Sequence, residues 1–139
     1  FQPAANILYF GSKGQGAHKV DADGNQTQLS GGQHYSEKSA VKVVASRSHM
    51  SPETEAFVEE LKSAGKEVEL TSSGSSLKLC LVASGEADVY PRFAPTMEWD
   101  TGAAHAVALE AGRQVLNRET NQPLQYNKEN LLNPWFIVE

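Results

Sequence analysis

Apolar and polar residues alternate along this chain in short blocks that predict strands followed by helices. The β-branched run at 40–45 predicts a strand, and Ser51 and Pro52 then supply the N-cap and first residue of a helix over 53–64. Gly65 is a typical residue to end that helix. The face that we expect the helix to bury carries Ala56, Phe57, Leu61 and Ala64.

The same order of strand and helix continues to the end of the chain. A short helix follows Ser75 or Ser76, either of which fits as its N-cap, and Gly85 ends it. We expect the other elements to be strands at 68–70, 88–90, around 115 and at 135–138, and a helix over 97–111. This order predicts an α/β fold, a layered sheet with helices on its faces, in which parallel strands are joined through helices. The 139 residues are expected to form a single domain.

A hairpin is predicted before these elements, because two apolar runs at 7–10 and 17–20 flank the glycine-rich residues 11–16. The glycine spacing is not that of a P-loop and no helix follows, so the pattern favours a turn over a phosphate loop. The acids at 21–25 lack the later ligands of a calcium loop and also indicate a turn. We interpret the polar residues 25–39 as a surface excursion.

Composition narrows the function classes. The net charge of −5 argues against nucleic-acid binding through a general basic field, so an anionic ligand would need local cations. The single cysteine, Cys80, excludes an internal disulfide and a cysteine-rich zinc site, and favours a reducing compartment such as the cytoplasm. No apolar run approaches about 18 residues and no leader is visible, so neither a membrane span nor a signal peptide is expected. Phe1 in place of methionine suggests a chain cut at its front.

Four polar segments follow predicted strands, at 46–49, 72–78, 90–92 and 99–100. Ligands of layered α/β folds collect at the carboxyl ends of strands, so we expect these segments to meet in one crevice. Their hydroxyls, cations and single carboxylate suit a phosphate together with a metal ion. The plainer interpretation is that Asp100 is an acid in a first helical turn, Ser75 is a helix cap, and Lys78 and Arg92 are solvated surface charges.

The aromatic residues near these segments have an ordinary explanation. With a negatively charged chain, Trp99, Trp135 and Phe136 are expected in the core or anchoring the C-terminal strand, rather than forming a platform for bases. His105 is expected to be packed or solvated rather than catalytic.

Three motifs in this half of the chain carry a resemblance to a known family. They read GSSLKLC at 74–80, GEADVYPR at 85–92 and PTMEWDT at 95–101, with weaker support from 44–49 and 126–134. The sequence resembles the carboxy-terminal half of CysQ-type 3′(2′),5′-bisphosphate nucleotidases, within the inositol monophosphatase superfamily. The resemblance implies that residues 1–139 are the C-terminal, substrate-binding domain of that fold.

The same resemblance implies a Mg²⁺-dependent phosphatase that removes the 3′-phosphate of adenosine 3′,5′-bisphosphate and leaves AMP. Asp100 matches the metal ligand of the family's Trp-Asp motif. The positions that match the family's substrate-binding residues are His49, Gly74, Ser75, Lys78 and Arg92.

The chain also departs from the family. The first metal motif, Asp-Pro-hydrophobic-Asp-Gly-Thr, and the upstream glutamate are absent, so the N-terminal metal-motif domain is missing and Asp100 is the one family metal ligand present. We therefore expect no appreciable phosphatase activity and weak or no Mg²⁺ binding from this chain alone. Gly102 and Ala104 occur in the reverse of the family's usual order, and Arg113 replaces a glycine.

Two alternatives stay open at this point. One is a sister activity, an inositol monophosphatase or a fructose bisphosphatase, which shares the Trp-Asp element. The other is a noncatalytic half that binds a nucleotide or a partner, including a missing N-terminal half. Apolar surface left uncovered by such a half would favour a homo-oligomer.

Overall fold

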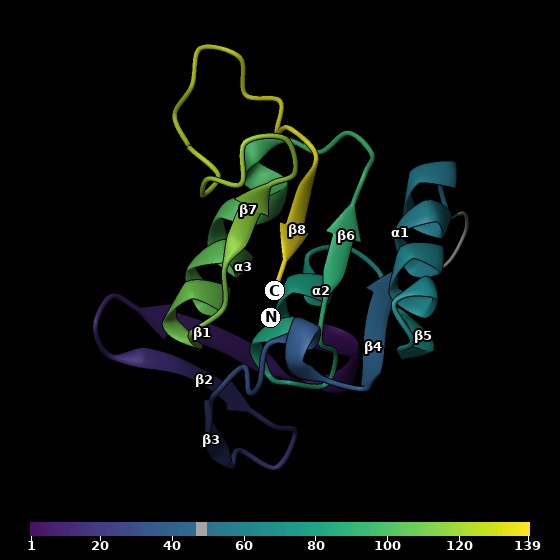
Figure 1. Cartoon of the computed structure of the whole chain (residues 1–139). Helices are drawn as coiled ribbons and strands as arrows, with labels where there is room; N and C mark the ends of the chain where they lie inside the picture. Colours follow the sequence, from purple (N-terminus) through teal and green to yellow (C-terminus); the bar gives the residue numbers. More distant parts are fainter. Residues whose placement is uncertain (47–49) are drawn as a thin grey trace.

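The computed structural model describes residues 1–46 and 50–139 of the chain (Figure 1). Two 3₁₀ turns lie at Pro3–Ala5 and Tyr35–Glu37. The helices are α1 (Pro52–Ser63), α2 (Leu77–Ala83) and α3 (Glu98–Glu110). The strands are β1 (Leu8–Ser12), β2 (Gly16–Val20), β3 (Gln26–Leu29), β4 (Ala40–Ala45), β5 (Glu67–Ser72), β6 (Tyr90–Arg92), β7 (Val115–Asn117) and β8 (Phe136–Val138).

The main sheet runs in the order β5, β4, β6, β8, β7 (Figure 1). β4 and β5 are parallel, and a parallel bridge between Val43 and Val89 joins β4 to the residue just before β6. β8 is antiparallel to both β6 and β7, which departs from the expected pairing of parallel neighbours. The reason is the connection: no helix lies between β7 and β8, so the chain returns in the opposite direction.

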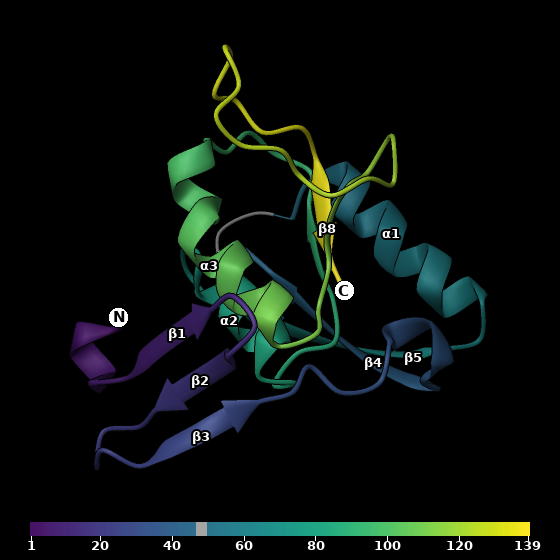
Figure 2. The same cartoon turned by 90° about the vertical axis from the view of Figure 1, so that its left-hand side faces the viewer.

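Helices cover both faces of this sheet, as the strand and helix order predicts (Figure 2). α1 lies on one face, where Phe57 and Leu61 pack with Val43 and Ile137. α2 and α3 lie on the other face, and that core includes Phe136. Phe136 and Ile137 are neighbours in β8 yet enter different cores, because successive side chains of a strand point to opposite faces.

A second, antiparallel sheet of β1, β2 and β3 packs against α3. The predicted hairpin is confirmed, with Phe10 opposite His18. A side chain at Gly11 would lie 3.2 Å from the Cα atom of Val107, so glycine permits this close approach. Residues 25–39 are largely exposed, as expected of a surface excursion, but they contain the strand β3, which was not predicted. Leu29 alone is buried in β3, which leaves little hydrophobic signal to detect.

α1 begins as predicted, with Ser51 accepting a hydrogen bond from the backbone N–H of Thr54. Its buried face differs from the expected one, since Thr54 and Val58 are buried while Ala56 and Ala64 are exposed. None of the described helices is long and apolar enough to span a membrane.

The placement of the aromatic residues is only partly as expected. Phe136 is 1% exposed, but Trp99 is 68% and Trp135 42% exposed. Trp99 lies in the first turn of α3, and Trp135 precedes β8 beside the ring of Phe93. The expectation of a core or C-terminal anchoring position is therefore wrong for Trp99, whereas Trp135 contacts Phe93 next to the C-terminal strand without being buried.

Candidate functional site

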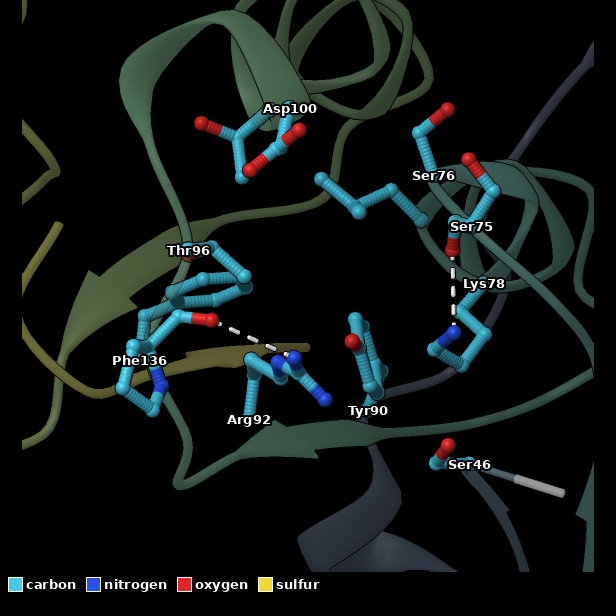
Figure 3. Close-up of a pocket in the computed structure, with 12 residues that line it drawn as sticks. Ser46, Ser75, Ser76, Lys78, Tyr90, Arg92, Thr96, Asp100 and Phe136 are labelled. Carbon is cyan, nitrogen blue, oxygen red and sulfur yellow. Dashed lines mark hydrogen bonds between the residues drawn. The ribbon is translucent and has the colours of Figure 1, made fainter. Parts of the chain in front are cut away.

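A cavity of about 300 Å³ lies between α2, β6 and the first turn of α3 (Figure 3). Each of the four polar segments picked out in the sequence contributes to it, the first through Ser46 and the last through Asp100. The lining residues are Ser46, Ser75, Ser76, Lys78, Leu79, Tyr90, Arg92, Pro95, Thr96, Asp100, Thr101 and Phe136. The predicted convergence of these segments is confirmed. His49 lies outside the described residues, and Gly74 is in the right segment but does not line the cavity.

Lys78 forms one wall of the cavity from the first turn of α2. Its side chain is buried, and the Nζ atom donates to the carbonyl oxygens of Ser73 at 3.1 Å and Ser75 at 2.9 Å. The same atom lies 5.3 Å from the centre of the Tyr90 ring. The alternative that Lys78 is a solvated surface charge is therefore wrong, because backbone carbonyls and an aromatic face hold it in place.

Of the two serines beside Lys78, Ser76 occupies the predicted N-cap position of α2, which begins at Leu77, but it does not cap the helix with its side chain. Ser75 precedes the cap with a φ angle of 53°, in the left-handed region that residues other than glycine rarely adopt. This turn directs the Ser75 carbonyl toward Lys78 and leaves the side chains of both serines on the cavity wall (Figure 3).

Arg92 and Tyr90 form the floor of the cavity from β6 (Figure 3). The Nη2 atom of Arg92 donates to the carbonyl of Pro95 at 3.3 Å, whereas its Nε atom is buried and finds no hydrogen-bond partner within 1–46 and 50–139. Burial raises the pKa of Tyr90 to about 12, against the opposing effect of the Arg92 charge, so the phenol stays protonated at neutral pH. A guanidinium N–H in this position can donate to an anion that enters the cavity.

Asp100 faces these cations from the first turn of α3 (Figure 3). Its Oδ2 atom accepts a hydrogen bond from the backbone N–H of Met97 at 2.8 Å, so it also closes the start of the helix. Both interpretations of Asp100 therefore hold in part. It is a first-turn helix acid, and its carboxylate lines the same cavity as Lys78 and Arg92.

The carboxylates of the described residues do not form a metal centre by themselves. Within residues 1–46 and 50–139, no group of three or more histidine, cysteine, aspartate or glutamate side chains could hold an ion. A magnesium ion at Asp100 would need further carboxylates or substrate oxygens, since one carboxylate already bound to a backbone N–H is a poor site.

The sequence reasoning missed two hydroxyls of this site, those of Thr96 and Thr101. Thr101 is 2% exposed and follows Asp100 directly in α3. A threonine beside the candidate acid was the available signal, but its burial depends on contacts more than twenty residues away along the chain.

Comparison with known proteins agrees with this geometry. Residues 1–135 match the model of the inositol monophosphatase family. This chain belongs to that family. The resemblance of its motifs to CysQ is also confirmed, because the 3′(2′),5′-bisphosphate nucleotidase CysQ of Escherichia coli K12 is 39% identical over 139 residues. That match covers 99% of this chain and 52% of the Escherichia coli protein.

Solved structures of the family show the same fold. CysQ from Bacteroides thetaiotaomicron is 47% identical with a TM-score of 0.88, covering 99% of this chain and 55% of that one. Mycobacterium tuberculosis SuhB is 26% identical with a TM-score of 0.61, covering 97% of this chain and 49% of that one. The chain spans about half the length of the curated CysQ relatives that match nearly all of it, such as the Escherichia coli K12 protein.

Proposed function

We propose that this chain is the C-terminal, substrate-binding half of a 3′(2′),5′-bisphosphate nucleotidase, and that the complete enzyme converts adenosine 3′,5′-bisphosphate to AMP and phosphate. The observation that carries the proposal is the single cavity in which Lys78, Arg92 and the two serines face Asp100. The similarity to CysQ nucleotidases at 39% and 47% identity supports the choice of substrate class.

The cations of the cavity suit the phosphate that is not transferred. Lys78 brings a buried ammonium group, and Arg92 brings an Nε–H that has no hydrogen-bond partner among the residues that the structure describes. A phosphate oxygen accepting from that N–H would satisfy a buried donor, which makes the hydrogen bond more favourable than one formed at a solvated arginine. The hydroxyls of Ser46 and Ser75 add neutral donors to the same cavity. By resemblance, His49 would lie beside the nucleotide.

Asp100 remains the candidate metal ligand of this half. When bound, Mg²⁺ would polarise the transferred phosphoryl group, as it does in phosphatases generally. Since the described residues offer only this one carboxylate at the cavity, we propose that the 139-residue chain alone has no appreciable phosphatase activity and binds Mg²⁺ weakly or not at all.

A chimera tests this proposal. The part of Bacteroides CysQ that this chain does not cover would be joined in front of Phe1 and assayed for phosphate release from adenosine 3′,5′-bisphosphate with Mg²⁺. We expect activity from the chimera and none from the 139 residues alone. A rate from the 139 residues comparable to that of the chimera would overturn the proposal that this chain is inactive. A chimera that folds and prefers inositol monophosphate would favour the sister activity.

A noncatalytic nucleotide-binding role is the second candidate, because the cations lie within this chain while a complete metal site does not. Calorimetry of the 139-residue chain with AMP or adenosine 3′,5′-bisphosphate, together with an assay of phosphate release from the bisphosphate, distinguishes the cases. Binding without turnover supports a binding half, and the absence of binding leaves only a structural role.

Two further proposals concern the oligomeric state and the location of the protein. Leu8 and Phe10 are more than a third exposed on β1, so apolar surface is available for self-association. Sedimentation at high concentration would then show a species larger than the monomer. We also propose a cytoplasmic location, which the lone, buried Cys80 thiol fits.

A further inference from the structure

The first turn of α3 is held from outside by a loop segment that precedes β8. We call residues 126–133 the strap. The backbone N–H of Glu98 donates to the carbonyl of Leu131 at 3.0 Å. The Glu98 carboxylate in turn accepts from the backbone N–H groups of Asn127 at 2.6 Å and Lys128 at 3.2 Å, and from the Lys128 ammonium group. The strap therefore binds both the backbone and the side chain of the first residue of the helix.

Thr101 is the point where the strap reaches the cavity. Its Oγ1 atom donates to the Glu98 carbonyl at 3.2 Å and accepts from the Tyr126 hydroxyl at 3.2 Å and the Asn133 amide at 3.1 Å. The Asn133 amide also donates to the Met97 carbonyl at 2.9 Å. Because Thr101 and Asn133 are buried, breaking any of these bonds would leave a polar group without water to replace its partner.

The hydrogen bonds from His105 through Tyr126 to Thr101 all donate in the same direction, towards Thr101. The Tyr126 hydroxyl has one proton and donates it to Thr101, so the Nδ1 atom of His105, 2.7 Å away, must be the donor to Tyr126. Burial lowers the pKa of His105, which favours the neutral ring. His105 therefore carries its proton on Nδ1, and its Nε2 atom has no proton to donate. This agrees with the position of Nε2, which is buried and has no hydrogen-bond partner among the described residues.

This network of hydrogen bonds reaches the residues before and after Asp100 in the first turn of α3. The Met97 N–H donates to Asp100 Oδ2, the Met97 carbonyl accepts from Asn133, and Thr101 follows Asp100 directly. We propose that Thr101, Tyr126 and Asn133 are positioning residues, which hold the turn of α3 so that the Asp100 carboxylate faces Lys78 and Arg92 across the cavity. The inference deepens the proposed function and rests on it for its catalytic consequence, while the structural part stands on the contacts alone.

The structural part is tested on the 139-residue chain by amide hydrogen exchange. The reporter is the N–H of Met97, and the N–H of Val44, bound to the Val89 carbonyl, is the internal reference. Thr101→Val removes the hydroxyl at nearly constant shape, and we expect Met97 to exchange about tenfold faster, with Val44 unchanged, from the loss of roughly one net hydrogen bond. Thr101→Ser keeps the hydroxyl and should retain the protection.

Two strap variants guard against an effect confined to Thr101. Asn133→Ala and Tyr126→Phe should also speed the exchange of Met97. Asn130→Ala is the matched control, because Asn130 lies in the strap but bonds only to the N–H of Leu132 among the described residues. Unchanged exchange of Met97 in both Thr101→Val and Asn133→Ala would overturn the inference.

The catalytic part is tested in the chimera. Since Thr101 acts on Asp100 rather than on the cations, Thr101→Val should lower kcat about tenfold and leave KM for adenosine 3′,5′-bisphosphate within about twofold, with rescue by Thr101→Ser. A loss of activity that Thr101→Ser does not rescue, or one expressed in KM, would refute the positioning role. If the unaltered chimera is inactive, the proposed function fails, and the exchange of Met97 still decides whether the strap holds the turn.

Discussion

The Nζ atom of Lys78 lies 5.3 Å from the centre of the Tyr90 ring, so the main cation of the cavity rests on an aromatic face. Lys78→Met keeps the length and apolar stem of the side chain but removes its charge. We expect the affinity for AMP to fall by about tenfold to a hundredfold, because a charge-assisted hydrogen bond is worth roughly 1.5–3 kcal/mol. Calorimetry on the 139-residue chain measures this. Lys62→Met, at an exposed lysine paired with Glu59, is the control, and equal affinities in the two variants would contradict the prediction.

The glycine-rich turn between β1 and β2 binds a carboxylate of the protein itself. Glu110, at the end of α3, accepts from the N–H groups of Gly14 at 3.0 Å and Gly16 at 3.1 Å. Glu110→Ala should lower the free energy of unfolding by about 1–3 kcal/mol, because two backbone donors lose a charged acceptor. Urea denaturation checks this against Glu129→Ala, an exposed glutamate. A loss no larger than that of the control would show that the turn does not depend on Glu110.

Arg113 occupies the space beside Gly31. A Cβ atom at Gly31 would overlap the middle of the buried Arg113 side chain, whose Nη2 atom donates to the Gln33 carbonyl. Gly31→Ala should therefore destabilise the protein by about 1–3 kcal/mol. In an Arg113→Gly background the added methyl group has room, and its cost should largely disappear. Thermal or urea unfolding of the four proteins forms a double-mutant cycle, and a coupling energy near zero would contradict the prediction.

Acid should destabilise the protein through His105. Burial lowers the pKa of His105 in the folded chain, so the unfolded chain takes up the proton more readily. The stability contributed by the neutral ring is complete above the ordinary histidine pKa of about 6.5 and is lost as the pH falls below it.

His105→Gln should therefore lose less stability than the unaltered chain between about pH 7.5 and pH 5.5, as measured by urea denaturation. Equal acid dependence in the unaltered chain and in His105→Gln would be the contrary result.

The thiol of Cys80 should be unreactive in the folded protein. Burial raises the pKa of Cys80 to about 11, which disfavours the reactive thiolate. At about pH 8, alkylation should be slow in buffer and fast in urea, and it should follow the unfolding curve. Rapid alkylation of the native chain would show that the core around α2 opens without global unfolding.

Much of the fold could be predicted because its signals are local. Ser51, Pro52 and Gly65 define the ends of α1 within one turn of each end, and the hairpin is visible in two apolar runs around a glycine-rich turn. The convergence of the polar segments also followed from the sequence, since the carboxyl ends of strands share one edge of a sheet.

The burial of individual side chains and the polar edge strand were predicted less well. Phe57 and Leu61 are buried as predicted, but Ala56, Ala64 and Trp99 are exposed, because a spacing pattern does not show which neighbours cover a residue. β3 was missed, since a polar edge strand with one buried leucine resembles a loop. His49 stays a prediction outside the described residues.

The sequence by itself determined most of the elements apart from β3, the family motifs and the segments that form the cavity. Only the tertiary structure decided that Lys78 is buried against Tyr90, that Glu110 binds a turn 96 residues away, and that the strap fixes Thr101 beside Asp100. The physical reason is the distance along the chain between the residues that interact. Caps and turns are set by bonds between neighbouring residues, whereas burial and long-range hydrogen bonds exist only after the layers have packed and removed water from between them.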